Sequence, residues 1–159
     1  MFTHNLHNFS ELEDRITFLH MQQKEVNTTV VSFESQIRHL REMLKYAEQY
    51  QKNKIYNDHY KKSKDPERYF RKYESQIILF AGAEHILQEN GIELKHLNTN
   101  KLQAQISDLI SRKKALNTSY ASFNQEIKEL KLIHQNLYKY LKQEAPEIPK
   151  DSQNELPSL

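Results

Sequence analysis

Apolar residues recur at alternating steps of four and three residues over the first third of the chain. The positions are Leu12, Ile16, Leu19, Gln23, Val26, Val30, Phe33, Ile37, Leu40, Leu44, Ala47 and Gln51. Only the two Gln residues interrupt the apolar series. A strict seven-residue repeat of this length predicts a long helix that supercoils against another helix with a left-handed twist.

Capping signals set the bounds of this first helix. Ser10 and Glu13 have the spacing of a capping box, in which each side chain binds a free backbone N–H group. The helix is therefore expected to begin near Glu11. Because no Gly or Pro occurs between Ser10 and Asp65, it is expected to continue to about Ser63.

A second helix is predicted over residues 66–89. Asp65 can accept a hydrogen bond from the first turn, and Pro66 fits the first helical position because its missing N–H group is not needed there. Asn90 and Gly91 provide a left-handed C-terminal cap, and residues 90–98 form a connection. The expected buried face of this helix consists of Tyr69, Tyr73, Ile77, Phe80, Ala81 and Leu87.

A third helix is predicted over residues 99–143, beginning at Asn98 or Thr99. It carries a second seam with the same stepping. The positions are Leu102, Ile106, Leu109, Lys113, Leu116, Tyr120, Phe123, Ile127, Leu130, His134, Leu137 and Leu141. Lys113 and His134 occupy seam positions, where a polar group usually fixes the register or the choice of partner.

The two seams have the same length, so antiparallel pairing within one chain is expected. The expected pairs are Leu12 with Leu141, Val30 with Phe123, and Gln51 with Leu102. Residues 52–101 then form a helical tip at the far end. The predicted fold class is all-α: a long antiparallel coiled-coil helical hairpin with a short helix packed at the tip.

The expected domain organisation is one coiled-coil helical domain over residues 10–143. Residues 1–9 form an N-terminal arm. The last segment, residues 144–159, has three Pro and no apolar period, so it is expected to be a disordered tail.

Composition supports long amphipathic helices and excludes several kinds of chemistry. Hydrophobic residues make up 37% and charged residues 28% of the 159 residues, with only two Gly. Because there is no Cys, the chain cannot form disulfides, Cys-ligated zinc sites or thiol nucleophiles. No apolar run is long enough for a membrane span, and no leader is recognisable. We expect a soluble cytoplasmic protein without membrane insertion.

Positive charge is concentrated in residues 52–72, although the whole chain has a net charge of only +2. Eight cations stand against three carboxylates there, which gives a local charge of +5. The cations are Lys52, Lys54, Lys61, Lys62, Lys64, Arg68, Arg71 and Lys72. Tyr56 and Tyr60 are interleaved with them, and cations with aromatic rings suit phosphate contacts and stacking on bases. These ten residues form the candidate nucleic-acid-binding site, for DNA or RNA.

A structural interpretation of the same residues stays open. Tyr56 with Tyr60, and Tyr69 with Tyr73, are spaced by four residues, so these rings can pack the first helix against the second. The Lys side chains would then only solvate the outer surface.

No catalytic or metal site is recognisable in the sequence. His4 and His7 have a spacing that could ligate a metal, with His20 nearby, but no third ligand or carboxylate cluster supports a site. The chain has no Gly-rich phosphate loop, no nucleophile elbow and no paired carboxylates in a cleft. We expect no enzymatic activity, no metal and no cofactor.

Two runs of the central segment resemble the C-terminal region of conjugative relaxases, the mobilisation nucleases of conjugative elements. Residues 53–63 read Asn-Lys-Ile-Tyr-Asn-Asp-His-Tyr-Lys-Lys-Ser, and residues 69–83 read Tyr-Phe-Arg-Lys-Tyr-Glu-Ser-Gln-Ile-Ile-Leu-Phe-Ala-Gly-Ala. A later element is similar as well, with Leu109, Lys113, Lys114, Ala115, Leu116 and Tyr120. The likeness covers roughly residues 12–141, of which the coiled-coil parts are generic.

The resemblance implies a role in DNA processing or in recruitment to the transfer machinery. The family's nuclease domain is not recognisable, and His4 and His7 do not reproduce its His-hydrophobic-His pattern, so nicking activity is not implied. The expected function is a non-catalytic accessory or C-terminal module of a relaxase, either excised or free-standing, that contacts DNA and transfer-machinery proteins. The alternative is a structural coiled-coil protein that self-associates as a homo-oligomer or scaffolds a partner without nucleic acid.

Overall fold

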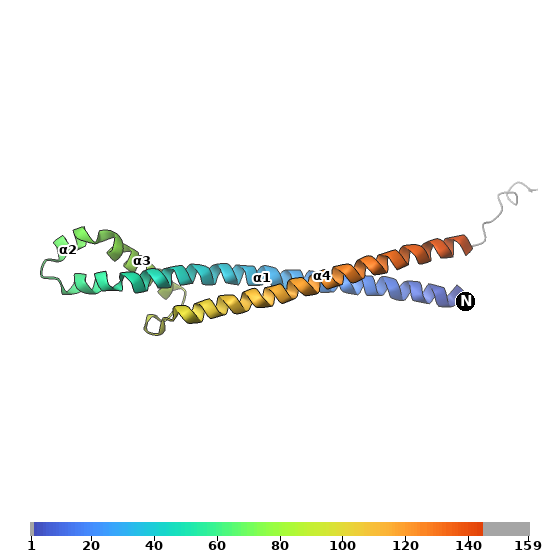
Figure 1. The fold of residues 1–159 in the computed structure, drawn as a ribbon, viewed down its shortest axis with the longest axis horizontal. Helices are drawn as coiled ribbons and strands as arrows, with labels where there is room; N and C mark the ends of the chain where they lie inside the picture. The colour runs from blue at the N-terminus through green and yellow to red at the C-terminus, as the bar shows by residue number, and fades with distance from the viewer. Residues whose placement is uncertain (1, 145–159) are drawn as a thin grey trace, which may run out of the picture. The chain divides into compact units, whose positions relative to one another are not determined.

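The computed structural model describes residues 2–144, with side chains described for residues 8–143. Its elements are α1 (Phe2–Lys62), α2 (Pro66–Lys72), α3 (Glu74–Glu89), the 3-10 helix η1 (Leu94–His96) and α4 (Thr99–Glu144) (Figure 1). No strand occurs within residues 2–144. The predicted fold class, all-α with a helical hairpin, is confirmed.

The chain divides into two compact units, and both long helices contribute to each. Within the described residues, unit 1 comprises residues 2–27 and 118–144, and unit 2 comprises residues 28–117. Each unit therefore contains one part of α1 and one part of α4.

In unit 1, α1 and α4 run antiparallel and pack along a narrow seam. Leu19 is fully buried, and Ile127 is buried with 2% of its surface exposed. Three cross-helix contacts border this seam. They are the Phe9 ring stacked on His134 at 4.3 Å, Glu13 Oε1 at 3.1 Å from His134 Nε2, and Arg15 Nη2 at 3.1 Å from Glu126 Oε1.

In unit 2, the same two helices bury a cluster of larger apolar side chains. Phe33 and Ile37 from α1 pack with Ile106 and Leu109 from α4. Burying one such side chain stabilises the fold by about 1.5–3 kcal/mol, so this cluster is a main source of helix pairing in the unit.

The last part of α1 has a different partner, which is α3. Leu87 of α3 packs with Met43 and Ala47 of α1, and the rings of Phe80 and Tyr50 stack at 4.7 Å. Asn53 is 3% exposed, and its Nδ2 donates to the backbone oxygen of Gln49 at 2.9 Å. Met43 is buried although it lies outside the predicted seam, because α1 presents a second face to α3.

The predicted caps at Asp65, Asn98 and Gly91 act as expected. Asp65 Oδ1 accepts from the Arg68 N–H at 3.2 Å, and Asn98 Oδ1 accepts from the Lys101 N–H at 3.2 Å. Gly91 has a φ of 74°, the left-handed conformation that ends α3. These caps explain why α2 and α4 begin at Pro66 and Thr99.

The start of α1 differs from the prediction. The helix begins at Phe2 rather than near Glu11, so residues 2–9 are helical and the predicted arm over residues 1–9 is wrong for them. Ser10 and Glu13 lie inside the helix, since no Gly or Pro precedes them and Phe9 is held by its stack on His134.

The predicted helix over residues 66–89 is divided at Tyr73, which has a φ of −122° and a ψ of 29°. Hydrogen bonds continue through the bend: Tyr73 N donates to Tyr69 O at 3.1 Å, and Ile77 N donates to Tyr73 O at 3.0 Å. The Tyr73 ring packs on Tyr56, and this cross-helix contact accompanies the departure from helical geometry. Ala81, predicted to be buried, is exposed, and Ala83 is buried instead.

The predicted register of the two long helices is also wrong, by about one heptad. Gln51 is exposed and does not face Leu102, which packs against the cluster of Met43 and Ala47. A slip of one heptad keeps the same apolar faces opposed, so the apolar pattern cannot detect it. The tail predicted for residues 144–159 falls outside the described residues, except that Glu144 ends α4.

Candidate nucleic-acid interface

The candidate segment, residues 52–72, runs from the last turns of α1 into α2, all within unit 2. A short turn joins the two helices. Ser63 N donates to Tyr60 O at 3.3 Å, and Ser63 Oγ accepts from the Asp65 N–H at 3.2 Å. Asp65 then caps α2, so the direction of the chain is fixed by local hydrogen bonds.

Aromatic rings hold the end of α1 against α2 and the start of α3. The Tyr60 ring lies 5.7 Å from Phe70, and the Tyr56 ring lies 5.0 Å from Tyr73, which is itself 4.7 Å from Tyr69. Contacts of this geometry stabilise beyond the area that they bury. We call these five rings, those of Tyr56, Tyr60, Tyr69, Phe70 and Tyr73, the aromatic layer.

Within the aromatic layer, the surroundings of Tyr69 favour its neutral phenol. Desolvation raises the pKa of the Tyr69 hydroxyl above its usual value, and the neighbouring phenols of Tyr73 and Tyr56 raise this pKa further. The Tyr69 phenol therefore carries no negative charge near neutral pH and does not offset the positive charge of the segment.

Every predicted cation of the segment is exposed. These are Lys52, Lys54, Lys61, Lys62, Lys64, Arg68, Arg71 and Lys72. Arg71 Nη2 lies 3.7 Å from Glu67 Oε2, and Lys72 Nζ lies 5.3 Å from the centre of the Tyr73 ring. Within the described part of the chain, Lys61, Lys62 and Lys64 have no carboxylate within ion-pair distance.

The two predicted aromatic site residues are placed differently from the cations. Tyr56 and Tyr60 are half-buried, and their rings pack against Tyr73 and Phe70. A nucleic-acid base would need an exposed ring face to stack on. The packing that the sequence left open as an alternative is observed for both rings, while the cations stay exposed.

The polar seam residues have cross-helix partners that the sequence did not identify. Lys113 Nζ lies 3.1 Å from Glu34 Oε1 in unit 2, and His134 contacts Glu13 in unit 1. The sequence feature that could have identified these pairs is a cation at a seam position of one helix together with a carboxylate next to the seam of the other.

Of the histidines considered as metal ligands, His20 is exposed, and His4 and His7 lie outside the described side chains. Among the described residues, no three His, Asp or Glu side chains come close enough to hold an ion.

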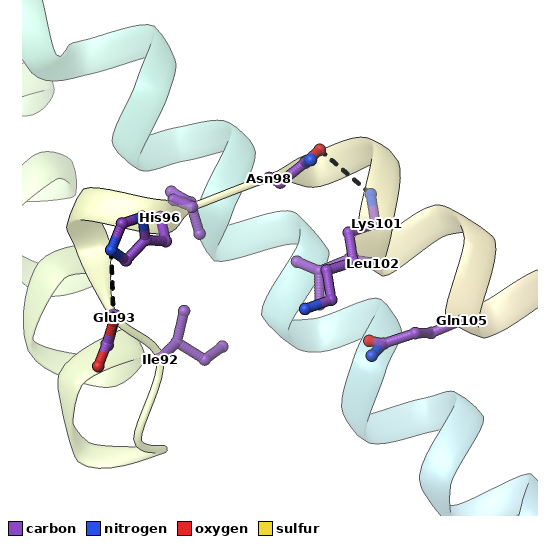
Figure 2. A pocket seen from close by; sticks show the side chains of 8 residues that line it. Ile92, Glu93, His96, Asn98, Lys101, Leu102 and Gln105 are labelled. Carbon is purple, nitrogen blue, oxygen red and sulfur yellow. Dashed lines mark hydrogen bonds and ion pairs between the residues drawn. The ribbon is translucent and has the colours of Figure 1, made fainter.

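A pocket of about 270 Å³ lies where η1 leads into α4 (Figure 2). Figure 2 shows His96 beside Glu93, with 3.8 Å between Nε2 and Oε2, and Asn98 capping the helix above Leu102. None of the predicted cations lines this pocket. This pocket and the basic segment are therefore different features of unit 2.

Comparison with known proteins gives no relative for the chain. No family model matches it, and neither a curated protein nor a solved structure matches it. The likeness to relaxases therefore rests on the central residues quoted above. None of the described helices combines the length and the apolar character that crossing a membrane requires.

Proposed function

We propose that this chain is a non-catalytic helical module that binds the phosphate backbone of DNA through its basic segment, residues 52–72. The observation that carries the proposal is the exposure of all eight cations of this segment. Three of them, Lys61, Lys62 and Lys64, follow one another closely at the junction of α1 and α2. Lysines that neutralise phosphates release counterions, which gives affinity without sequence specificity.

The proposed setting is conjugative mobilisation, in which the module would recruit DNA or transfer-machinery proteins to a relaxase without cutting DNA itself. Support comes from the likeness of residues 53–63 and 69–83 to relaxase C-terminal regions. The aromatic layer has a supporting role in this proposal, since it fixes α2 on α1 and so holds the cations of both helices in one arrangement.

The test is a DNA-binding titration at several salt concentrations with single-stranded and double-stranded oligonucleotides. The triple variant Lys61→Gln, Lys62→Gln and Lys64→Gln should bind more weakly than the wild type. The slope of log affinity against log salt is negative, and each lost phosphate contact makes it shallower by about 0.9 for duplex and about 0.7 for single strands. Three lost contacts to duplex would make the slope shallower by about 2.7.

A matched control removes the same charge elsewhere. Lys128, Lys131 and Lys139 are exposed on α4 in unit 1, and replacing them with Gln changes the net charge equally. The control variant should keep the wild-type salt slope. Equal slopes for the wild type and the Lys61/Lys62/Lys64 variant, with helicity unchanged, would show that the basic segment does not touch phosphate.

A further inference from the structure

The middle of the outer face of α3 is apolar at Ile78, Leu79, Ala81 and Gly82, although nothing in the described chain covers it. Residues 77–83 read Ile-Ile-Leu-Phe-Ala-Gly-Ala, so this part of the helix is apolar on every side. Ile77, Phe80 and Ala83 are buried on the inner face, but Ile78 is 54% exposed and Leu79 is 45% exposed. A helix that is apolar all round is typical of one that is covered on more than one side.

Gly82 lies in the middle of this outer face. A Cβ atom added there would meet nothing within 4 Å, so no contact inside the chain requires glycine. Glycine is also one of the least favourable residues for the interior of a helix. What glycine does offer at such a position is the close approach of another backbone.

The residues around Gly82 form a stripe that is complementary to itself. Ser75, Ile78, Gly82, His85 and Glu89 follow steps of three and four, so they share one side of α3. When two such stripes are laid antiparallel, Ile78 of each copy faces Gly82 of the other. A branched side chain then meets the position that has no side chain, which is the fit of a knob into a hole.

Charge at the two ends of the helix favours the same antiparallel direction. Arg71 and Lys72 of α2 precede α3, and Glu74 lies in its first turn, while Glu89 and Glu93 lie at its end and beyond, and all five are exposed. Antiparallel copies place Arg71 and Lys72 of one copy near Glu89 and Glu93 of the other, whereas parallel copies place these like charges together. The present partners of Arg71 and Glu89 are exposed neighbours on their own helices, Glu67 and His85, and such pairs contribute little stability.

From this geometry we propose that the outer face of α3 is a docking surface for α3 of a second copy of the chain, related by a two-fold axis. Such an interface uses the same residues on both copies and is closed, so it produces a dimer and no larger assembly. It is separate from the apolar cluster that α1 and α4 bury between them within one chain. It also does not depend on contact with DNA. Because it involves one helix from each copy, the association is reversible and depends on concentration.

Sedimentation equilibrium of the full chain over a wide concentration range tests this proposal. The wild type should show a monomer–dimer equilibrium, and Ile78→Glu should raise the dissociation constant by about tenfold or more. Val31→Glu is the matched control, because Val31 on α1 is 55% exposed and lies outside α3. It should dimerise like the wild type. A wild type that stays monomeric, or an Ile78→Glu variant that dimerises as well as Val31→Glu, overturns the proposal.

Gly82→Ala separates docking from folding. The added methyl group meets nothing within the chain, so the melting temperature of the dilute monomer should rise. The same methyl group holds the two backbones apart, so the dissociation constant should rise, and it should rise further for Gly82→Leu. Dimerisation that is unchanged in both Gly82 variants overturns the proposal. So does a lower melting temperature of Ile78→Glu under dilute conditions, because another part of the same chain would then cover the face.

Discussion

Lys113 Nζ lies 3.1 Å from Glu34 Oε1, and this contact marks the register of α1 and α4 in unit 2. Lys113 stands at a seam position, where the equal-length pairing of the two seams would have placed it opposite Leu40. The observed pairing gives the ammonium group a carboxylate partner and leaves the Lys113 side chain 32% exposed. A cation at a seam position therefore favours the observed register of the two helices over the register that is displaced by one heptad.

A charge swap tests this register. Glu34→Lys and Lys113→Glu each place like charges together and should lower the free energy of unfolding, whereas the double swap should restore most of the loss. Because both side chains are partly exposed, the coupling energy should be modest, about 0.5 kcal/mol. Chemical denaturation of the four proteins in low salt measures it. In the register expected from the sequence, Glu34 would face Ser119, and the two swaps would then simply add.

The sequence predicted the helices better than their pairing, for a physical reason. The apolar period and the caps at Asp65, Asn98 and Gly91 are local signals, and they gave the starts of α2 and α4 and the end of α3. Register depends on which polar side chains meet across the pair, and every heptad presents nearly the same apolar face. The bend at Tyr73 was missed because it accompanies a ring contact with Tyr56, which is distant along the chain.

The candidate site was predictable in its charge but not in its aromatic part. Runs of Lys and Arg remain exposed in most environments because burying an unpaired charge is costly, and the exposure of Lys61 and Lys62 follows from this. A Tyr residue is ambiguous in sequence, since its ring can pack inside or stack outside. In the structure, the Tyr56 ring packs against Tyr73, between α2 and α3, and the Tyr60 ring packs against Phe70 of α2. These contacts show that both rings pack inside the chain.

Replacement of Tyr56 should show that its ring stabilises the fold in the absence of any nucleic acid. Tyr56→Ala removes the contact with Tyr73 and should lower the free energy of unfolding by about 2 kcal/mol. Tyr56→Phe keeps the ring and should stay within about 0.5 kcal/mol of the wild type. Thermal and urea unfolding followed by circular dichroism measure both changes.

The control for this change is Tyr138→Ala, because Tyr138 lies on α4 with 55% of its surface exposed. Its loss should change stability little, by about 0.5 kcal/mol or less. If Tyr56→Ala were no more destabilising than Tyr138→Ala, the aromatic layer would not hold α2 against α1, and a binding role for the Tyr56 ring would regain support.

The two Gln residues that interrupt the first seam lie in different surroundings. Gln23 is 8% exposed, and its Nε2 has no hydrogen-bond partner among the described residues, whereas Gln51 is exposed. Asn53 is also buried, but its amide donates to Gln49 O. An amide nitrogen that is removed from water and makes no hydrogen bond destabilises the folded state, so Gln23 lowers the stability of unit 1.

Gln23→Leu should therefore raise the free energy of unfolding by about 1 kcal/mol, because it replaces a desolvated amide by an apolar side chain of similar size. Gln51→Leu makes the same chemical change at an exposed position and should leave stability within about 0.5 kcal/mol of the wild type. Urea unfolding of the three proteins, compared through midpoints at equal m-values, measures the difference. A destabilised Gln23→Leu variant would contradict this account, because the amide would then be making a hydrogen bond that the fold needs.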